Sequence, residues 1–280
     1  MSLKAVADFL VKLALTEDVG PGDITTRAVV AKDQKAGAVI TAKKDGVIAG
    51  LFAAEDVFRH IDHRIRFQRK VKDGAFVEKG KVIATVAGPA RGILTGERVA
   101  LNFLQHLSGI ATLTRNFKLQ ISNFKRKTKL LDTRKTTPGL RALEKYAVKM
   151  GGGENHRLGL YDAILIKDNH VKLAGGIGEA IERVKGQVAR GKKIEIETKT
   201  IAEVKEAISF DADRILLDNM QIKTLREAVR LCKKAGIKTE ASGGVNLKNV
   251  AAVAATGVNF ISIGALTHSA KALDINLKIV

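Results

Sequence analysis

The chain is poor in cysteine and in aromatic residues, and each shortage argues against a class of protein. Its single cysteine, Cys232, cannot form a disulfide within the chain, so a reducing, cytoplasmic setting fits best. There is no tryptophan, and aromatic residues make up only 4% of the sequence. Proteins that bind single-stranded nucleic acid usually stack bases on aromatic rings, so this scarcity argues against that function.

Long apolar runs are also missing. No run approaches the roughly 18 residues that a membrane-spanning helix needs. The N-terminal segment instead places Val6, Phe9, Leu10 and Leu13 at helical spacing, and Asp8 interrupts any signal-peptide core. We therefore expect an amphipathic helix at the start of a cytoplasmic protein.

Positive charge, in contrast, is abundant. Lysine and arginine total 48 against 29 acidic residues, which gives a formal net charge of +19. Such a surplus attracts anions without selecting among nucleic acid, membrane surfaces and polyanionic metabolites. With 45% apolar and 28% charged residues, the composition is that of an ordinary globular protein. The 280 residues suffice for two modest domains or for one barrel with an appendage.

The first third of the chain predicts an α+β module with a mostly antiparallel sheet. Short alternating runs fill residues 36–51 and 63–94. Asp45-Gly46 is a hairpin turn pair, so we expect the strands on either side of it to pair with each other.

A long helix is predicted over residues 96–117. His106 lies on it, and we expect a packing or surface contact there rather than a metal site. The basic run at 123–129 is interpreted as a solvated helix end and loop.

From residue 129 onward, strand-like runs alternate with helix-like segments, which is typical of parallel α/β structure. Glycines mark the ends of two of the predicted helices, at Gly236 and Gly257. An incomplete α/β barrel and an open doubly wound sheet both fit this alternation. The six strand-like runs begin at Lys129, Ala163, Ile194, Arg214, Ile237 and Phe260.

The residues at the ends of these strands help to decide between the barrel and the doubly wound sheet. Every run ends on polar residues or glycine. In α/β barrels the carboxyl ends of the strands converge on one face, where the catalytic groups lie, so we expect one shared pocket. Its predicted members are Arg134, Lys135, Lys167, Glu197, Asp218, Ser242, Gly243, Gly244 and Gly264, joined by His156 and Arg157 from a loop.

The chemistry of these residues predicts the ligand. Arginine forks suit carboxylates and phosphates, and glycines allow a phosphate to approach the backbone. The acidic pair Glu197 and Asp218 suits ribose hydroxyls or Mg²⁺, a cation that prefers oxygen ligands. Because Glu195 and Glu197 occupy the same strand, we expect only one of them to face the lumen. The set predicts a substrate with a phosphate, a sugar or metal-bound pyrophosphate, and a partner that carries carboxylates.

The segment Leu131–His170 closely resembles the quinolinate phosphoribosyltransferase family. It reads LDTRKTTPGLRALEKYAVKMGGGENHRLGLYDAILIKDNH. Further blocks resemble the family in the family's order: LTEDVGPGDITT, GERVALNFLQHLSGIAT, IEIET, RILLDNM, EASGGV and ISIGALTHSAKALDINLKI. The resemblance extends over nearly all of the chain.

This resemblance implies an α/β fold with two domains. Residues 1–110 would form an N-terminal α/β sandwich, and residues 111–280 an incomplete, seven-stranded α/β barrel, with the C-terminal tail able to pack back on the N-terminal domain. It also implies a homodimer, in some members a hexamer, whose active sites are each completed by the neighbouring subunit.

The implied reaction joins quinolinate to phosphoribosyl pyrophosphate with Mg²⁺, releasing nicotinate mononucleotide, pyrophosphate and carbon dioxide in NAD synthesis. By resemblance, Lys135, Lys167, Glu197 and Asp218 are the catalytic residues, and the last two are also candidates to hold Mg²⁺. The residues implied to bind substrate are these four with Arg98 from the other subunit, Arg134, His156, Arg157, Ser242, Gly243, Gly244 and Gly264.

Three alternatives remain at the level of sequence. One is the molybdenum-transport-associated homologue, which has a similar fold and a different substrate. A nicotinate-specific phosphoribosyltransferase would have less need for a dense cationic pocket. The third is a basic nucleic-acid-binding protein, although the basic residues are scattered and no nucleic-acid motif is present. The TTPG and HRLGL motifs favour quinolinate.

Overall fold

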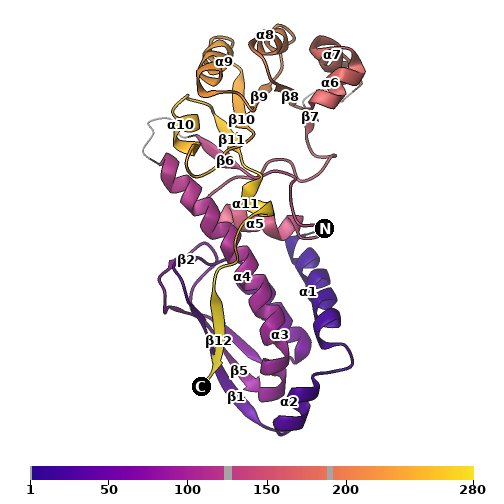
Figure 1. The fold of residues 1–280 in the computed structure, drawn as a ribbon. Helices are drawn as coiled ribbons and strands as arrows, with labels where there is room; N and C mark the ends of the chain where they lie inside the picture. Colours follow the sequence, from indigo (N-terminus) through magenta and orange to yellow (C-terminus); the bar gives the residue numbers. More distant parts are fainter. Residues whose placement is uncertain (1, 123–127, 188–191) are drawn as a thin grey trace. The chain divides into compact units, whose positions relative to one another are not determined.

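The computed structural model describes residues 2–122, 128–187 and 192–280 (Figure 1). Most of the basic run predicted as a helix end, at 123–127, lies outside the described residues. The chain divides into two compact units, whereas the predicted division between residues 110 and 111 stays a prediction. The first unit comprises Met1–Arg115, Thr136–Gly152 and Leu266–Val280, and the second comprises Asn116–Lys135 and Gly153–Ala265.

The first unit is built on a four-stranded sheet in the order β12-β1-β5-β3. Its strands are β1 (Lys35–Ala42), β3 (Arg66–Arg69), β5 (Val82–Pro89) and β12 (Ile275–Ile279), and every pairing between them is antiparallel. The mostly antiparallel sheet predicted for the first third is confirmed. Its edge strand β12 comes from the far end of the sequence and pairs with β1.

One face of this sheet carries the core of the first unit. Along β1 the alternate residues Ala38, Ile40 and Ala42 are buried, as expected of a strand with one face on a core. They pack with apolar residues of three helices, α1 (Leu3–Val19), α3 (Leu51–Ile61) and α4 (Ala90–Ile121). The shorter helices α2 (Ile24–Val29), α5 (Arg141–Met150) and α11 (Ala265–His268) complete the helices of this part of the chain.

The hairpin predicted at residues 45–46 is wrong. The strand that follows, β2 (Gly46–Val47), pairs with β4 (Phe76–Val77) and not with β1. Close packing explains the glycine, because a Cβ there would lie 2.7 Å from side-chain atoms of Leu273 and Thr112. The Thr112 hydroxyl also accepts a hydrogen bond from the Val47 N–H at 2.9 Å. These contacts between distant segments override the local turn preference.

The second unit holds a parallel sheet of six strands in the order β6-β11-β10-β9-β8-β7. This is the cyclic order of a barrel opened between its first and second strands. A doubly wound sheet would instead reverse its strand order partway across the sheet. The strands match the six runs predicted from sequence. They are β6 (Lys129–Leu131), β7 (Ile164–Ile166), β8 (Ile194–Thr198), β9 (Arg214–Asp218), β10 (Lys238–Ser242) and β11 (Phe260–Ser262).

Helices follow the strands and cover one face of this sheet. Gly236 and Gly257, both at positive φ, follow two of these helices closely, which confirms the glycine ends. Cys232 is fully buried in α9, as its apolar setting predicts. The helices are α6 (Asp168–Ala174), α7 (Ile177–Gln187), α8 (Ile201–Ser209), α9 (Ile222–Lys234) and α10 (Val250–Ala254). Among the described residues, no helix has the length and apolar character needed to cross a membrane.

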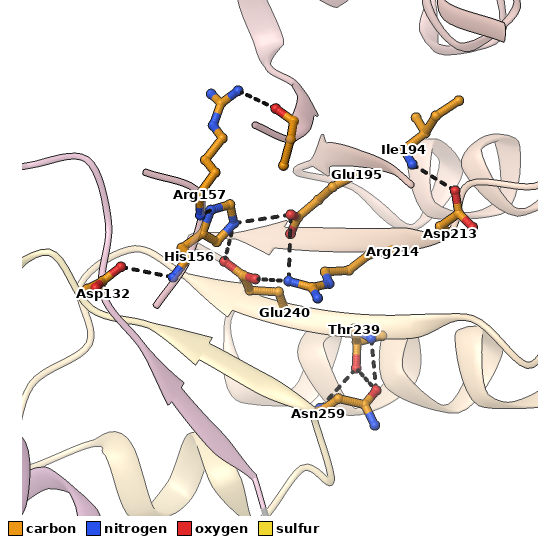
Figure 2. A network of polar contacts seen from close by, with 11 residues as sticks. Asp132, His156, Arg157, Ile194, Glu195, Asp213, Arg214, Thr239, Glu240 and Asn259 are labelled. Carbon is orange, nitrogen blue, oxygen red and sulfur yellow. Dashed lines mark hydrogen bonds and ion pairs between the residues drawn. The ribbon is translucent and has the colours of Figure 1, made fainter. Parts of the chain in front are cut away.

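The six parallel strands of the described residues are one fewer than the resemblance implies. Residues 153–157 run beside the free edge of β6, where a further strand would lie, but form only an isolated bridge between Leu131 and Glu154. The Glu154 N–H donates to the Leu130 carbonyl at 2.8 Å, and the Glu154 carbonyl accepts from the Asp132 N–H at 3.2 Å. Two residues further on, the side chain of His156 turns toward buried residues of β8 and β10 (Figure 2).

Candidate active site

The carboxyl ends of β8 and β9 bring together a cluster of charges. Asp218 pairs with Ser242 in the sheet, and Glu197 pairs with Leu216, so both carboxylates extend from the same face. Burial raises the pKa of Glu197, and the nearby carboxylates of Asp218 and Asp168 raise it further, while Lys167 and Lys199 oppose the shift. Three of the predicted site residues therefore share one location.

Two members of this cluster were not among the predicted site residues. Asp168 opens α6 and forms an ion pair with Lys199, 2.7 Å from its Nζ. The hydrogen bond from Lys199 is the main cause that lowers the pKa of Asp168. Asp168 and Lys199 come just after the ends of β7 and β8, and this position in the sequence could have indicated both.

A glycine turn borders the same cluster. Gly243 and Gly244 follow β10 at φ of 90° and 61°, values that favour glycine. A Cβ on Gly243 would lie 2.2 Å from Asn219 Oδ1, so only glycine fits. Asn219 itself has φ of 52°, and its N–H donates to the Ser242 carbonyl at 2.9 Å. The turn after β9 and the turn after β10 are thus packed together, while phosphate binding there stays a prediction.

Two arginines of the second unit influence each other electrostatically. Arg157 is 9% exposed, and burial lowers the pKa of its guanidinium. The charge of Arg134, which follows β6, is the next cause of this lowering, so the two guanidinium groups are near enough for their charges to interact. Arg157 Nη1 donates to the Ala163 carbonyl at 3.1 Å, while its buried Nε has no hydrogen-bond partner among the described residues. Paired guanidinium groups of this kind suit a ligand with two negative charges.

His156 points into the interior of the sheet, where Figure 2 shows it meeting two glutamates. Its Nε2 lies 3.1 Å from Glu195 Oε2 and 3.6 Å from Glu240 Oε1. Its Nδ1 accepts a hydrogen bond of 2.8 Å from the Arg157 N–H. Both ring nitrogens therefore have partners within the protein, and the predicted role of His156 as a substrate ligand stays a prediction.

The expectation that only one of Glu195 and Glu197 faces the lumen is wrong. Side chains two apart on a strand point to the same face, and it is Ile194 and Ile196 that point the other way. Glu195 contacts His156, whereas Glu197 lies one layer nearer the carboxyl end beside Asp218. The two glutamates thus lie on the same face of the sheet, in two successive layers of side chains.

A partly buried ion pair adjoins the two glutamates that face the histidine. Arg214 Nη1 is 3.1 Å from Glu240 Oε2 and 3.7 Å from Glu195 Oε2, and its guanidinium lies 4.1 Å from the ring centre of Phe260. Burial, followed by the charge of Glu195, raises the pKa of Glu240 to about 7. Sequence reasoning missed Glu240, although it lies two residues before Ser242 and therefore on the same face.

The remaining predicted site residues are Lys135, Gly264 and Arg98. Lys135 follows Arg134, and its N–H donates to Thr133 Oγ1 at 3.0 Å. Gly264 follows β11. Arg98 is an exposed residue of α4 in the first unit, and its role in the site of a neighbouring subunit stays a prediction.

The fold and the charged rim define an enzyme of the α/β barrel class, with groups suited to a phosphate, a sugar and a dicarboxylate. The sequence matches two domains of quinolinate phosphoribosyl transferase, the N-terminal domain over residues 23–108 and the C-terminal domain over residues 110–278. The chain belongs to the quinolinate phosphoribosyl transferase family.

Individual relatives agree with this assignment. The chain is 46% identical over 263 residues to a probable carboxylating nicotinate-nucleotide pyrophosphorylase of Bacillus subtilis, covering 94% of this chain and 90% of the relative. It is 44% identical to a decarboxylating quinolinate phosphoribosyltransferase of Nicotiana tabacum, covering 96% and 81%. Among solved structures, the nicotinate-nucleotide pyrophosphorylase of Francisella tularensis superposes with a TM-score of 0.94 at 39% identity, covering 99% of this chain and 97% of that one.

Proposed function

We propose that this protein transfers the phosphoribosyl group of phosphoribosyl pyrophosphate to quinolinate and releases nicotinate mononucleotide, pyrophosphate and carbon dioxide, a step of NAD synthesis. The observation that carries the proposal is the match of both domains, together covering residues 23–108 and 110–278, to quinolinate phosphoribosyl transferase. The geometry adds support, because a carboxylate cluster and an arginine pair extend from one parallel sheet.

The carboxylate cluster suits the sugar. As the bond from ribose C1 to pyrophosphate breaks, its electron pair leaves with pyrophosphate, and positive charge develops on the ribose ring. Glu197 and Asp218 would bind the ribose hydroxyls and stabilise that charge, an electrostatic effect that is strong in a site shielded from water. Lys135 and Lys167 would interact with the negative groups of the two substrates, and the turn at Ser242–Gly244 would hold the phosphate.

The arginine pair suits the pyridine. Arg134 and Arg157 would bind the two carboxylates of quinolinate, joined by Arg98 of a second subunit. The ring nitrogen gives its lone pair to ribose C1 and becomes a pyridinium. This positive nitrogen stabilises the carbanion that remains when the adjacent carboxylate leaves as carbon dioxide, and the carbanion then takes up a proton. No covalent intermediate with the protein is needed, so positioning and electrostatics account for catalysis.

Mg²⁺ fits the residues at this rim. The carboxylates of Glu197, Asp218 and Asp168 are oxygen donors. The pKa of Glu197 is raised by burial and then by the charges of the other two carboxylates, and a bound cation would offset that repulsion. When bound, Mg²⁺ would neutralise charge on the departing pyrophosphate. Glu197 and Asp218 would hold it, directly or through water.

A homodimer with shared sites, or a hexamer built from such dimers, is part of the proposal, and so is a cytoplasmic setting. The exposed position of Arg98 leaves its guanidinium available to another subunit. The buried, unpaired thiol of Cys232 suits a reducing compartment.

The test is a product assay with purified protein, phosphoribosyl pyrophosphate and MgCl₂, in which quinolinate and nicotinate are run side by side. We expect nicotinate mononucleotide from quinolinate, and less of it from nicotinate by roughly tenfold or more, because one lost ion pair of about 1.4 kcal/mol corresponds to tenfold. Equal use of nicotinate, or no product from quinolinate, would overturn the proposal.

A further inference from the structure

Residues Glu195, His156 and Arg157 form a chain of hydrogen bonds that leads from the sheet interior to the arginine pair. The Arg157 N–H donates to His156 Nδ1 at 2.8 Å, so Nδ1 carries no proton. The ring proton of the neutral imidazole is therefore on Nε2, which points at Glu195 Oε2 at 3.1 Å. Glu195 is 6% exposed, so water does not compete strongly for this contact.

We propose that Glu195 is a positioning residue, which selects the Nε2–H tautomer of His156 and thereby fixes the backbone and guanidinium of Arg157 for a dicarboxylate substrate. The proposal rests on the proposed function for the identity of that substrate. The opposite tautomer would place a proton on Nδ1, facing the Arg157 N–H, and two donors cannot bond each other. The loss of Glu195 therefore removes the nearer acceptor of Nε2–H and weakens the preference for the tautomer that holds the Arg157 N–H.

Other contacts hold the same segment from several strands (Figure 2). The buried Asp132, after β6, accepts the His156 N–H at 2.9 Å. Glu240 of β10 faces the same ring nitrogen as Glu195, with its Oε1 3.6 Å from Nε2, and Arg214 of β9 balances the charge of the two glutamates. His156 is fixed at its N–H and at both ring nitrogens. A small displacement of the Glu195 carboxylate should therefore move the ring, and with it the backbone of Arg157.

The position of His156 affects the direction of the Arg157 guanidinium. It is anchored at Nη1 by the Ala163 carbonyl, 3.1 Å away, and its buried Nε has no hydrogen-bond partner among the described residues. A buried donor without a partner is costly unless a ligand satisfies it. A carboxylate of the substrate supplies the acceptor, and the direction of this donor depends on the backbone that His156 holds.

A metal ion is the competing occupant of this cluster. His156, Glu195 and Glu240 offer ligand atoms that lie within 4.8 Å of one another. Two of the carboxylate oxygens, Glu195 Oε1 and Glu240 Oε1, have no hydrogen-bond partner within the part of the chain that the structure describes. A neutral histidine needs its proton on Nδ1 to bind a metal through Nε2, and the Arg157 N–H occupies that side. The cationic Arg214, 3.1 Å from Glu240, also opposes a second cation. The contacts therefore favour a hydrogen-bonded cluster of His156, Glu195 and Glu240 over a metal site.

The first experiment reads the tautomer directly in the intact protein. Nitrogen-15 NMR of the imidazole rings, with His156→Asn used to assign the signal among the six histidines, should show a protonated Nε2 and an unprotonated Nδ1 at neutral pH. An Nδ1–H ring, or a doubly protonated one, would overturn the proposal. This readout needs no turnover, so it stands apart from any failure of the proposed function.

The second experiment separates positioning from folding. Glu195→Ala should raise the KM for quinolinate roughly tenfold, the size of one hydrogen bond to a charged group, with the KM for phosphoribosyl pyrophosphate little changed. Glu195→Gln keeps an oxygen that accepts from Nε2–H and should restore most of the affinity. Glu227→Gln, on the exposed face of α9, is the matched control.

Equal loss in Glu195→Ala and Glu195→Gln, or equal rises in both KM values, would contradict the positioning role. Elemental analysis of dialysed wild-type protein should find no stoichiometric transition metal. A bound metal that is lost in both variants would assign the cluster to the ion instead.

Discussion

Glu197 on β8 and Asp218 at the end of the neighbouring strand β9 lie close together: burial raises the pKa of Glu197, and the carboxylate of Asp218 raises it further. Two like charges are thus held together at the carboxyl end of a parallel sheet, where they repel each other in the absence of a ligand. An arrangement that costs stability in this way is expected to be used in binding a cation or a developing positive charge.

Glu197→Gln should therefore reduce turnover more than it reduces substrate binding. We expect kcat to fall roughly 10²-fold, the size typical of removing one group that stabilises charge in a transition state. Steady-state kinetics with both substrates varied would measure this effect. Glu203→Gln, in the first turn of α8, where the side chain accepts a hydrogen bond from the N–H of the N-cap Thr200, is a control for local structure. A KM change for phosphoribosyl pyrophosphate with unaltered kcat would show ground-state binding instead.

Arg134→Ala should abolish most quinolinate binding, because Arg134 and Arg157 lie together and a dicarboxylate needs both. The loss of one buried partner of a charge pair typically costs 2–5 kcal/mol, which corresponds to roughly 30-fold or more in affinity. Isothermal calorimetry with quinolinate alone would measure it. Unchanged affinity would remove Arg134 from the binding site.

Arg98→Ala and Arg134→Ala proteins should regain partial activity when they are mixed. If each site takes Arg98 from one subunit and Arg134 from the other, hybrid dimers contain one site with both arginines and one with neither. Activity is measured before and after mixing, with subunit exchange checked by mass spectrometry. Proven exchange without recovery would show that the sites are not shared.

Glu240 should make the folding free energy depend on pH. Its pKa is raised from an ordinary 4.5 to about 7 in the folded chain, so the native state keeps a proton that the unfolded state has lost. Stability from this group is therefore fully present below about pH 4.5 and is lost as the pH rises toward 7. Glu195, His156 and Arg214 are the titratable or charged groups that face it.

Glu240→Gln carries no such proton, so its stability relative to the wild type should improve as the pH rises from 4.5 to 7. Urea unfolding of the two proteins at several pH values would give the difference. A difference independent of pH across this window would place the pKa of Glu240 near its ordinary value.

Much of the fold and part of the site could be predicted from the sequence, for identifiable reasons. Glu197 and Asp218 were found because each ends a legible strand, and strand ends converge whatever the tertiary details. The role of Glu195 and the presence of Glu240 were missed because they lie inside strands, where only the register shows which residues meet across the sheet. The hairpin at residues 45–46 failed because Leu273, far along the chain, determines the packing of Gly46.

Loss of the carboxylate next to the pyridine nitrogen is the central step of the proposed reaction. Quinolinate labelled with carbon-14 in either its 2- or its 3-carboxylate would be incubated with protein, phosphoribosyl pyrophosphate and MgCl₂. We predict that the 2-carboxylate label is released as carbon dioxide in equal amount to the nicotinate mononucleotide formed, while the 3-carboxylate label stays in the nucleotide. Release of the 3-carboxylate, or a nucleotide product that retains both labels, would contradict the account.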